Sequence, residues 1–190
     1  MAGQQHPIAG IDEVGRGPWA GPVVACALIL HRPVAGLADS KTVVRKKREA
    51  LLAALDRPGV ASYALGVASV AEIDRLNIRQ ATFLAMRRAV DRLPVRPLKV
   101  LIDGRDTPEL GVPAGAIVGG DGKVAAIAAA SIVAKTWRDA LMRRLHARHP
   151  HYGWATNVGY GTAEHRTALA RHGATRHHRQ SFAPIRALAG

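Results

Sequence analysis

Apolar and polar positions alternate along the chain in two different periods. Five short apolar runs predict β-strands, over residues 6–12, 22–30, 60–70, 98–103 and, more weakly, 115–118. Three longer segments repeat apolar residues at helical spacing and predict helices over 42–55, 77–93 and 123–149. Strands that alternate with helices are typical of an α/β fold, so we expect a sheet flanked by helices.

Two of the predicted helices carry more detailed signals. Asn77 precedes the second helix and Gln80 occupies its third position, which is the arrangement of a capping box. The third helix places apolar or small residues on one stripe, as a helix packed on a sheet does. These residues are Val124, Ile127, Ala128, Ser131 and Ile132.

The length and the change in composition near Pro150 suggest how the chain is organised. With 190 residues and 48% hydrophobic composition, the chain is long enough for one compact domain with a substantial core. Residues 1–150 hold all the predicted strands, whereas residues 151–190 are rich in Gly, His and Arg. We therefore expect a core over 1–150 and a smaller subregion of loop, helix and basic tail over 151–190.

The charge balance indicates what kind of partner the protein binds. The chain has 27 Lys and Arg against 14 Asp and Glu, a net charge of +13. A nucleic acid is the simplest anionic partner, because spaced basic residues follow a phosphate backbone and release its counterions. A solvated basic surface is the alternative. The irregular spacing of His172, His177 and His178 favours a phosphate-facing surface over a metal cluster.

The single cysteine and the apolar runs bear on location. Cys26 has no partner for an internal disulfide, which fits a reducing cytoplasm. The run over residues 18–30 is too short to cross a bilayer and contains Pro22, so a buried strand is expected there and no membrane association.

A few acidic residues stand where a charge is otherwise unfavourable. Asp12 and Glu13 follow a predicted strand directly and precede a glycine-containing turn, and Asp103 follows another strand and precedes Gly104. Neighbouring residues on a strand point to opposite faces, so we expect Asp12 to be the closer ligand of the two. Asp121 follows two glycines and precedes the third helix, where the alternative role is an N-cap.

Taken together, these acids suggest a metal site at the carboxyl edge of the sheet. Carboxylate oxygens are the ligands that Mg²⁺ and Mn²⁺ prefer, and such ions assist hydrolysis of phosphodiesters. Asp103 could instead be a turn-forming residue. Asp139 stands four residues after Lys135, which favours a local ion pair.

Seven segments of the sequence resemble one known family. Residues 10–25 read GIDEVGRGPWAGPVVA, which is similar to the signature of the type 2 ribonucleases H, bacterial ribonuclease HII. Six further blocks resemble the family in the same order, and coverage runs from about residue 8 to 185. They are DSK at 39–41, IDG at 102–104, GDG at 120–122, ASIVAKTWRD at 130–139, GYGT at 159–162 and HRQSF at 178–182.

The resemblance implies a fold, an activity and a set of metal ligands. The fold is a ribonuclease H-like mixed sheet flanked by helices, with a small C-terminal helical region that contributes to substrate binding. The implied enzyme is an endonuclease that hydrolyses the RNA strand of RNA/DNA hybrids. It also cuts 5′ of single ribonucleotides in duplex DNA with Mn²⁺ or Mg²⁺, leaving 5′-phosphate and 3′-hydroxyl ends. The family's four catalytic and metal-binding acids correspond to Asp12, Glu13, Asp103 and Asp121, with Asp139 as the competitor for the fourth place.

The resemblance also implies substrate contacts. In the family a Gly-Arg-Gly turn, here Gly15, Arg16 and Gly17, meets the ribonucleotide through backbone groups and its 2′-hydroxyl, and a tyrosine, here Tyr160, stacks beside it. Ser40 and Lys41 correspond to a phosphate contact. A basic residue often precedes the family's Gly-Tyr-Gly, whereas this chain has Asn157 and Val158.

Two other functions compete with this hypothesis. A related strand-transferring or DNA-resolving nuclease would cut all-DNA substrates, and a non-catalytic RNA/DNA-binding protein would bind without metal. We expect a monomer, because nothing in the sequence requires more.

Overall fold

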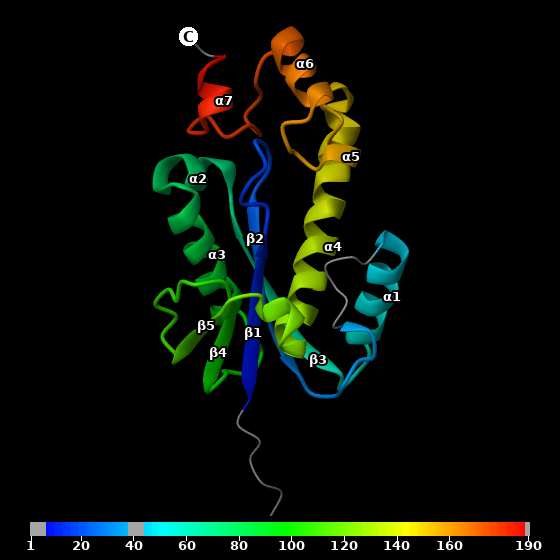
Figure 1. Cartoon of the computed structure of the whole chain (residues 1–190), viewed down its shortest axis with the longest axis vertical. Helices are drawn as coiled ribbons and strands as arrows, with labels where there is room; N and C mark the ends of the chain where they lie inside the picture. The colour runs from blue at the N-terminus through cyan, green and yellow to red at the C-terminus, as the bar shows by residue number, and fades with distance from the viewer. Residues whose placement is uncertain (1–6, 38–43, 189–190) are drawn as a thin grey trace, which may run out of the picture.

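The computed structural model describes residues 7–37 and 44–188, and its five strands form one mixed sheet (Figure 1). The strands are β1 (Ile8–Val14), β2 (Val23–Leu30), β3 (Ala61–Ala68), β4 (Lys99–Asp103) and β5 (Ala114–Ile117). All five predicted strands are present, with ends shifted by one or two residues at most positions. The prediction over 60–70 is wrong at its end, because Val70 already begins a helix.

The strand order is β3-β2-β1-β4-β5. β1 pairs antiparallel with β2 and parallel with β4, and β4 pairs parallel with β5. β1 and β4 therefore run in the same direction at the centre of the sheet and end at the same edge, which is where an α/β sheet places its ligands.

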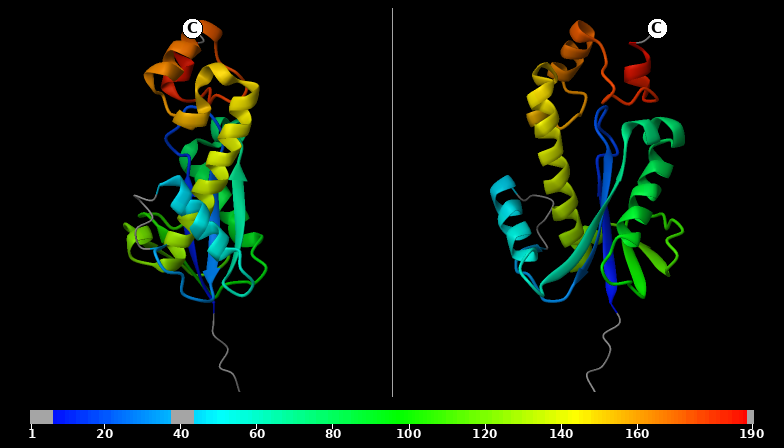
Figure 2. Two further views of the ribbon diagram at one scale, coloured as in Figure 1. Left: turned by 90° about the vertical axis from the view of Figure 1, so that its right-hand side faces the viewer. Right: turned by 180° about the vertical axis from the view of Figure 1, so that it is seen from behind.

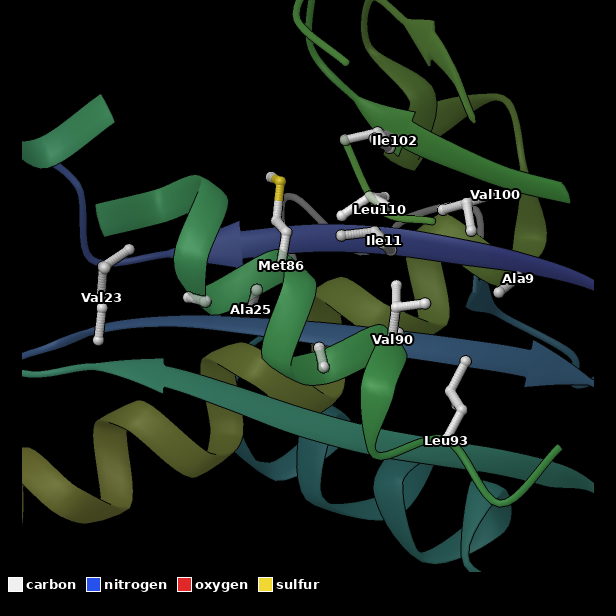
Figure 3. Close-up of a cluster of buried hydrophobic side chains, with 14 of the residues drawn as sticks. Ala9, Ile11, Val23, Ala25, Met86, Val90, Leu93, Val100, Ile102 and Leu110 are labelled. Carbon is white, nitrogen blue, oxygen red and sulfur yellow. The ribbon is translucent and has the colours of Figure 1, made fainter. Parts of the chain in front are cut away.

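One face of the sheet is covered by α3 (Ile78–Asp91). Figure 3 shows Met86 and Val90 of this helix pointing into a cluster of buried apolar side chains that includes Ile11 and Ile102 from the two central strands. Residues at odd positions of β1 thus face α3, because side chains alternate along a strand.

The opposite face is covered by α4 (Ala125–Arg148) with α1 (Arg45–Leu55) beside it. Gly10 makes this possible, because a Cβ there would lie 2.3 Å from the main-chain carbon of Ala126. The predicted stripe on this helix is too narrow, since every residue from Ile127 to Ala134 except Ser131 is buried between the sheet and α1. The start predicted for α1 at residue 42 lies outside the described residues.

A corner between β3 and α3 is formed by α2 (Val70–Leu76). Ser69 caps α2 with a full capping box, in which Ser69 Oγ accepts from Glu72 N and Glu72 Oε2 accepts from Ser69 N. The capping box predicted at Asn77 is only half formed: the Asn77 side chain accepts from Gln80 N, 3.1 Å away.

The C-terminal part of the chain packs on the far half of α4 as a second small core (Figure 2). It contains two short 3-10 or α turns, η3 (Pro150–Tyr152) and α5 (Trp154–Asn157), and the helices α6 (Ala163–His172) and α7 (Ala183–Arg186). Ala20, from the loop between β1 and β2, is buried in the same core. In the part of the chain that the structure describes, no helix is long and apolar enough to cross a membrane.

Candidate active site

Asp12 and Asp103 lie side by side at the ends of the two central parallel strands. Ile11 is in register with Ile102, so the following residues, Asp12 and Asp103, are neighbours across the strand pair. Both isoleucines face α3, which places the two carboxyl groups on the opposite face, toward α4. The predicted pairing of two strand-end acids is therefore present in the structure.

Asp12 is the more buried of the two, with 8% of its surface exposed. The pKa of Asp12 rises from 3.8 to about 7; burial is the main cause, and the negative charges of Glu13 and Asp103 contribute to the same shift. Hydrogen bonds from Ser131 of α4 and from the amide of Glu13, 2.8 Å from Asp12 Oδ1, act in the other direction. A bound cation would offset the unfavourable burial of this carboxylate and the nearby negative charges.

Glu13 points away from Asp12 and is half-buried. Its Oε1 accepts from Arg16 Nη1 at 3.2 Å, while Oε2 is buried and has no hydrogen-bond partner among the described residues. Burial raises the pKa of Glu13, and the ion pair with Arg16 lowers it. Asp12 thus faces α4 and Glu13 does not, and the expectation that Asp12 is the closer ligand of the two stays a prediction.

Asp121 lies in the short 3-10 helix η2 (Gly120–Gly122), which connects β5 to α4. The amide of Gly120 donates to Asp103 Oδ1 at 2.7 Å, so the segment that carries Asp121 is attached directly to Asp103. Asp121 is 4% exposed. The alternative role as N-cap is wrong, because Asp121 lies inside η2 and the residue at the N-cap position of α4 is Val124.

Asp139, the competitor of Asp121, has a different environment. Its carboxylate is 2.7 Å from Lys135 Nζ and 3.2 Å from Arg48 Nη2, so the predicted local ion pair is confirmed and extended by a second cation. Asp139 follows Ser131 by two turns of α4, about 12 Å along the helix axis. These contacts favour Asp121 over Asp139 as the acid that belongs with Asp12 and Asp103.

The acids are neighbours but do not form a closed cage. Within residues 7–37 and 44–188, no three His, Cys, Asp or Glu side chains are arranged so that they already surround a metal ion. The chain thus presents a pair of carboxylates, Asp12 and Asp103, with Glu13 and Asp121 on the adjoining segments.

The predicted substrate-contacting turn, Gly15–Gly17, begins directly beyond β1. Arg16 is exposed, and a Cβ on Gly17 would lie 3.3 Å from the ring of Tyr160, so that ring lies over the turn. Tyr160 is 49% exposed, as a residue that stacks on a ligand must be. Ser40 and Lys41 lie outside the described residues.

Asn157 and Val158, where the family pattern often has a basic residue, shape the loop before Tyr160. Asn157 Nδ2 donates to Tyr152 O at 2.7 Å, and Asn157 Oδ1 accepts from Gly159 N at 2.9 Å. Val158 adopts a left-handed conformation with φ of 45°. These two residues therefore set the backbone path of the loop.

A buried histidine pair supports the same loop. His165 Nδ1 lies 2.9 Å from Tyr160 O and so carries a proton, which leaves His165 Nε2 as acceptor for Trp154 Nε1 at 3.2 Å. His178 Nδ1 accepts from Thr175 N at 2.9 Å, and its Nε2 is 3.1 Å from His165 Nε2. Burial lowers the pKa of His178 to about 4. The prediction of a phosphate-facing surface is wrong for His178, which is fully buried.

Sequence reasoning also missed two buried arginines, Arg138 and Arg179, and the hydrogen bond from Ser131 to Asp12. The family-like blocks contain all three residues, but their motif positions alone do not say that the arginines bind main-chain carbonyls.

Comparisons with known proteins agree on one family. A family model described as Ribonuclease HII matches residues 9–185. A protein named Ribonuclease HII from Jannaschia sp. (strain CCS1) is 58% identical over 181 residues, covering 94% of this chain and 90% of that protein.

Solved structures show the same architecture. The ribonuclease H2 crystal structure from Pyrococcus horikoshii OT3 superimposes with a TM-score of 0.81 at 23% identity, covering 96% of both chains. Bst-RNase HIII in complex with Mn²⁺ gives a TM-score of 0.77 at 20% identity, covering 96% of this chain and 69% of that one. At these identities the structural likeness shows the shared fold.

Proposed function

This chain belongs to the ribonuclease HII family and is an endoribonuclease that acts on RNA/DNA hybrids, and from this premise we propose its substrate preference and its catalytic residues. The enzyme also cleaves duplex DNA at single embedded ribonucleotides. It cuts on the 5′ side of the ribonucleotide and leaves 5′-phosphate and 3′-hydroxyl ends. Asp12, Glu13, Asp103 and Asp121 are the catalytic acids.

The placement of Asp12 beside Asp103, on the face of the sheet toward α4, is the observation that supports these catalytic residues. Two carboxylates at the ends of adjacent parallel strands repel each other unless a cation lies between them. Burial, with smaller contributions from the charges of Glu13 and Asp103, raises the pKa of Asp12 to about 7, so an ionised Asp12 is unfavourable without a cation. The whole chain carries a net charge of +13, so a cluster of acids contrasts with an otherwise basic protein that can bind the phosphates of a nucleic acid.

The donor set fits a divalent cation such as Mg²⁺ or Mn²⁺. Both are hard ions that take oxygen ligands, and Mg²⁺ is commonly bound by one or two carboxylates together with waters and substrate phosphates rather than by a closed protein cage. Asp12 and Asp103 supply those carboxylates, and the buried Oε2 of Glu13 offers a further oxygen. When bound, the cation polarises the attacking water and stabilises the leaving oxygen.

The chain's own residues hold the substrate. The Gly15–Gly17 turn has no side chain at two of its three positions, so its backbone can approach a ribose closely, and the 2′-hydroxyl is the group that distinguishes RNA from DNA. The half-exposed Tyr160 ring over Gly17 provides an adjoining stacking surface. Ser40 and Lys41 remain expected phosphate contacts from the sequence, and residues 151–190 contribute through the Tyr160 loop.

We further expect the enzyme to act as a monomer in the cytoplasm. Cys26, the only cysteine of the chain, is buried in β2 and is not in a disulfide. A reducing compartment is compatible with that state.

Cleavage assays with three matched duplexes test the proposal. One duplex contains a single ribonucleotide, one is an RNA/DNA hybrid and one is all DNA. With Mg²⁺ or Mn²⁺ present, Asp12→Asn and Asp103→Asn should each reduce cleavage by roughly a thousandfold, because the cation contributes several kcal/mol to the transition state. Asp91→Asn, at an exposed acid on α3, is the matched control and should cleave normally.

Each alternative predicts a different result. Full activity in both site variants would overturn the catalytic assignment. Efficient cleavage of the all-DNA duplex would favour a DNA-resolving nuclease, and binding without cleavage at any metal concentration would favour a non-catalytic binding protein. Addition of a chelator should abolish cleavage of the two ribonucleotide-containing duplexes.

A further inference from the structure

Two arginine side chains are buried behind the Gly15–Gly17 turn. Arg138 extends from α4 and Arg179 from the segment before α7, and both are 0% exposed. Neither guanidinium forms an ion pair in the part of the chain that the structure describes; Asp139 and Asp74 act on them only at longer range. Burial lowers the pKa of Arg138 to about 10 and that of Arg179 to about 9.

Burying two charges without ion pairs is unfavourable by several kcal/mol per ion, so the arrangement requires a compensating use of their donors. All three nitrogens of each guanidinium donate to main-chain carbonyls, and these carbonyls lie in two segments: the loop over residues 15–22 and the loop before Tyr160. These arginines therefore act on the backbone of the substrate-contacting loops.

Arg179 binds the turn itself. Its Nη1 donates to Arg16 O at 2.8 Å, and its Nη2 donates to Gly15 O and, at 2.8 Å, to Gly21 O. Its Nε donates to Gly21 O at 3.0 Å. One planar guanidinium thus holds both sides of the loop together through carbonyl groups.

The direction of these carbonyls determines the direction of the amides. In a trans peptide the C=O and N–H groups point opposite ways, and the described residues contain no cis peptide bond. Because Gly15 O and Arg16 O point inward to Arg179, the N–H groups of Arg16 and Gly17 point outward. Neither amide donates to an acceptor among the described residues.

Arg138 joins the far end of the loop over residues 15–22 to the loop that carries Tyr160. It donates to Ala20 O and Pro22 O, each at 3.0 Å, and to Val158 O at 2.9 Å. A Cβ on Gly15, whose φ is +93°, would lie 2.2 Å from Arg138 Nε. The glycine at this position is therefore required both by the backbone conformation and by the guanidinium beside it.

We propose that Arg179 is a positioning residue that turns the amides of Arg16 and Gly17 toward the ribonucleotide, and that Arg138 fixes the loop over residues 15–22, which begins with this turn, against the Tyr160 loop. The proposal rests on the proposed function, because it assumes that this turn contacts the ribose. The buried positive charges behind the turn also strengthen the outward N–H groups as donors to an oxygen of the ribonucleotide. Arg179 does not itself touch the substrate.

Binding without turnover separates positioning from catalysis and from folding. In chelator, the affinities of wild type and Arg179→Lys are measured for two duplexes of one sequence, one with a single ribonucleotide and one all DNA. Lysine keeps the charge but has a single donor atom in place of the three nitrogens of the guanidinium. We expect the preference for the ribonucleotide duplex to fall about tenfold in Arg179→Lys, because a tenfold change corresponds to the free energy of roughly one hydrogen bond. The affinity for the all-DNA duplex should not change.

Arg88→Lys is the matched control. Arg88 also donates to a main-chain carbonyl, Val67 O at 2.7 Å, and pairs with Glu72, but it lies at the α2–α3 corner. Its lysine variant should lose stability and keep the wild-type preference. A merely structural role of Arg179 would give the same behaviour in both variants and would overturn the proposal.

The outcomes distinguish this proposal from the proposed function. A wild-type protein without any preference for the ribonucleotide duplex overturns both. A wild-type preference that survives in a folded Arg179→Lys overturns only the role of Arg179. If Arg179→Lys does not fold, amide hydrogen exchange of the wild type tests the proposal instead. The amides of Arg16 and Gly17 should gain protection when the ribonucleotide duplex binds and not when the all-DNA duplex binds. Equal protection of these amides by the two duplexes contradicts the proposal.

Discussion

Asp12 combines burial with the need to be ionised, and this conflict is measurable without substrate. A carboxyl group whose pKa is higher in the folded than in the unfolded state stabilises the fold only while it is protonated. For Asp12 that contribution is complete below about pH 4 and is lost as the pH rises through about 7. At physiological pH the ionised Asp12, which the proposed chemistry needs, should therefore destabilise the fold of the metal-free enzyme.

Asp12→Asn should remove that conflict. The amide oxygen of asparagine still accepts from Glu13 N, but the side chain never ionises. In chelator at pH 8 we expect the variant to be more stable than the wild type by about 2–4 kcal/mol in free energy of unfolding, which corresponds to the upward shift of a buried carboxyl pKa. Urea unfolding at pH 4 and pH 8 measures the difference.

The pH dependence is the control within this experiment. At pH 4 the aspartate is protonated in the folded state, so the two proteins should have nearly equal stability. Addition of Mg²⁺ at pH 8 should stabilise only the wild type and narrow the gap. A variant that is equally or less stable at both pH values would contradict the burial argument.

The sequence pattern identifies some functional residues and not others. Asp12 and Asp103 are identifiable because an acid directly after an apolar run is unusual. Arg138 and Arg179 are not, since an arginine in a chain with net charge +13 gives no sign of being buried. Only the folded loops bring carbonyl oxygens to them.

At the scale of elements, the contact between β1 and α4 holds the site together. α4 supplies Ser131 to Asp12 and Arg138 to the loop between β1 and β2, and it crosses β1 at Gly10 with main chain against main chain. The crossing is so close that no side chain fits between the two elements.

Gly10→Ala should therefore destabilise the fold strongly. The added Cβ would lie 2.3 Å from a main-chain carbon of α4, which a flexible side chain cannot relieve, so the helix must move. We expect a loss of at least about 3 kcal/mol in free energy of unfolding, at the upper end for overpacking. Urea denaturation provides the measurement.

Gly122→Ala is the matched control, because a Cβ at Gly122 would meet nothing within 4 Å. Its effect should stay within about 0.5 kcal/mol, as for ordinary surface substitutions. Similar stability of the two variants would show that α4 can shift away from β1 without loss, contrary to the packing described here.

At the scale of the whole molecule, the charge of +13 should govern how the enzyme binds any duplex. Lys and Arg that neutralise phosphates release counterions, so affinity falls as salt rises. If about four phosphates are neutralised, raising salt from 50 to 200 mM should weaken binding on the order of a hundredfold. Titrations with all-DNA and ribonucleotide duplexes at several salt concentrations measure this.

The two duplexes should show similar salt slopes, because phosphate contacts do not depend on sugar identity. The preference for the ribonucleotide duplex should stay nearly constant across the series. A preference that disappears at high salt would mean that charge, rather than the Gly15–Gly17 turn, distinguishes the substrates.

The hydrophobic pattern by itself determined the five strands, the α/β class and the three longer helices, because burial imposes a period of two on half-buried strands and 3.6 on helices. It placed acids at strand ends through the contrast between an apolar run and the charge that follows it. It failed at Val70 and at Asn77, where α2 makes a tight corner whose cap is set by Ser69 and Glu72.

Tertiary structure alone decided which side chains meet. The parallel register of β1 and β4 places Asp12 beside Asp103, and the attachment of Gly120 to Asp103 brings the segment of Asp121 to them, whereas Asp139 is held by two cations. Burial of Arg138, Arg179 and His178 depends on contacts between segments up to 164 residues apart, such as Arg179 with Gly15. Local patterns contain no information about such distant partners, so only the folded chain supplies them.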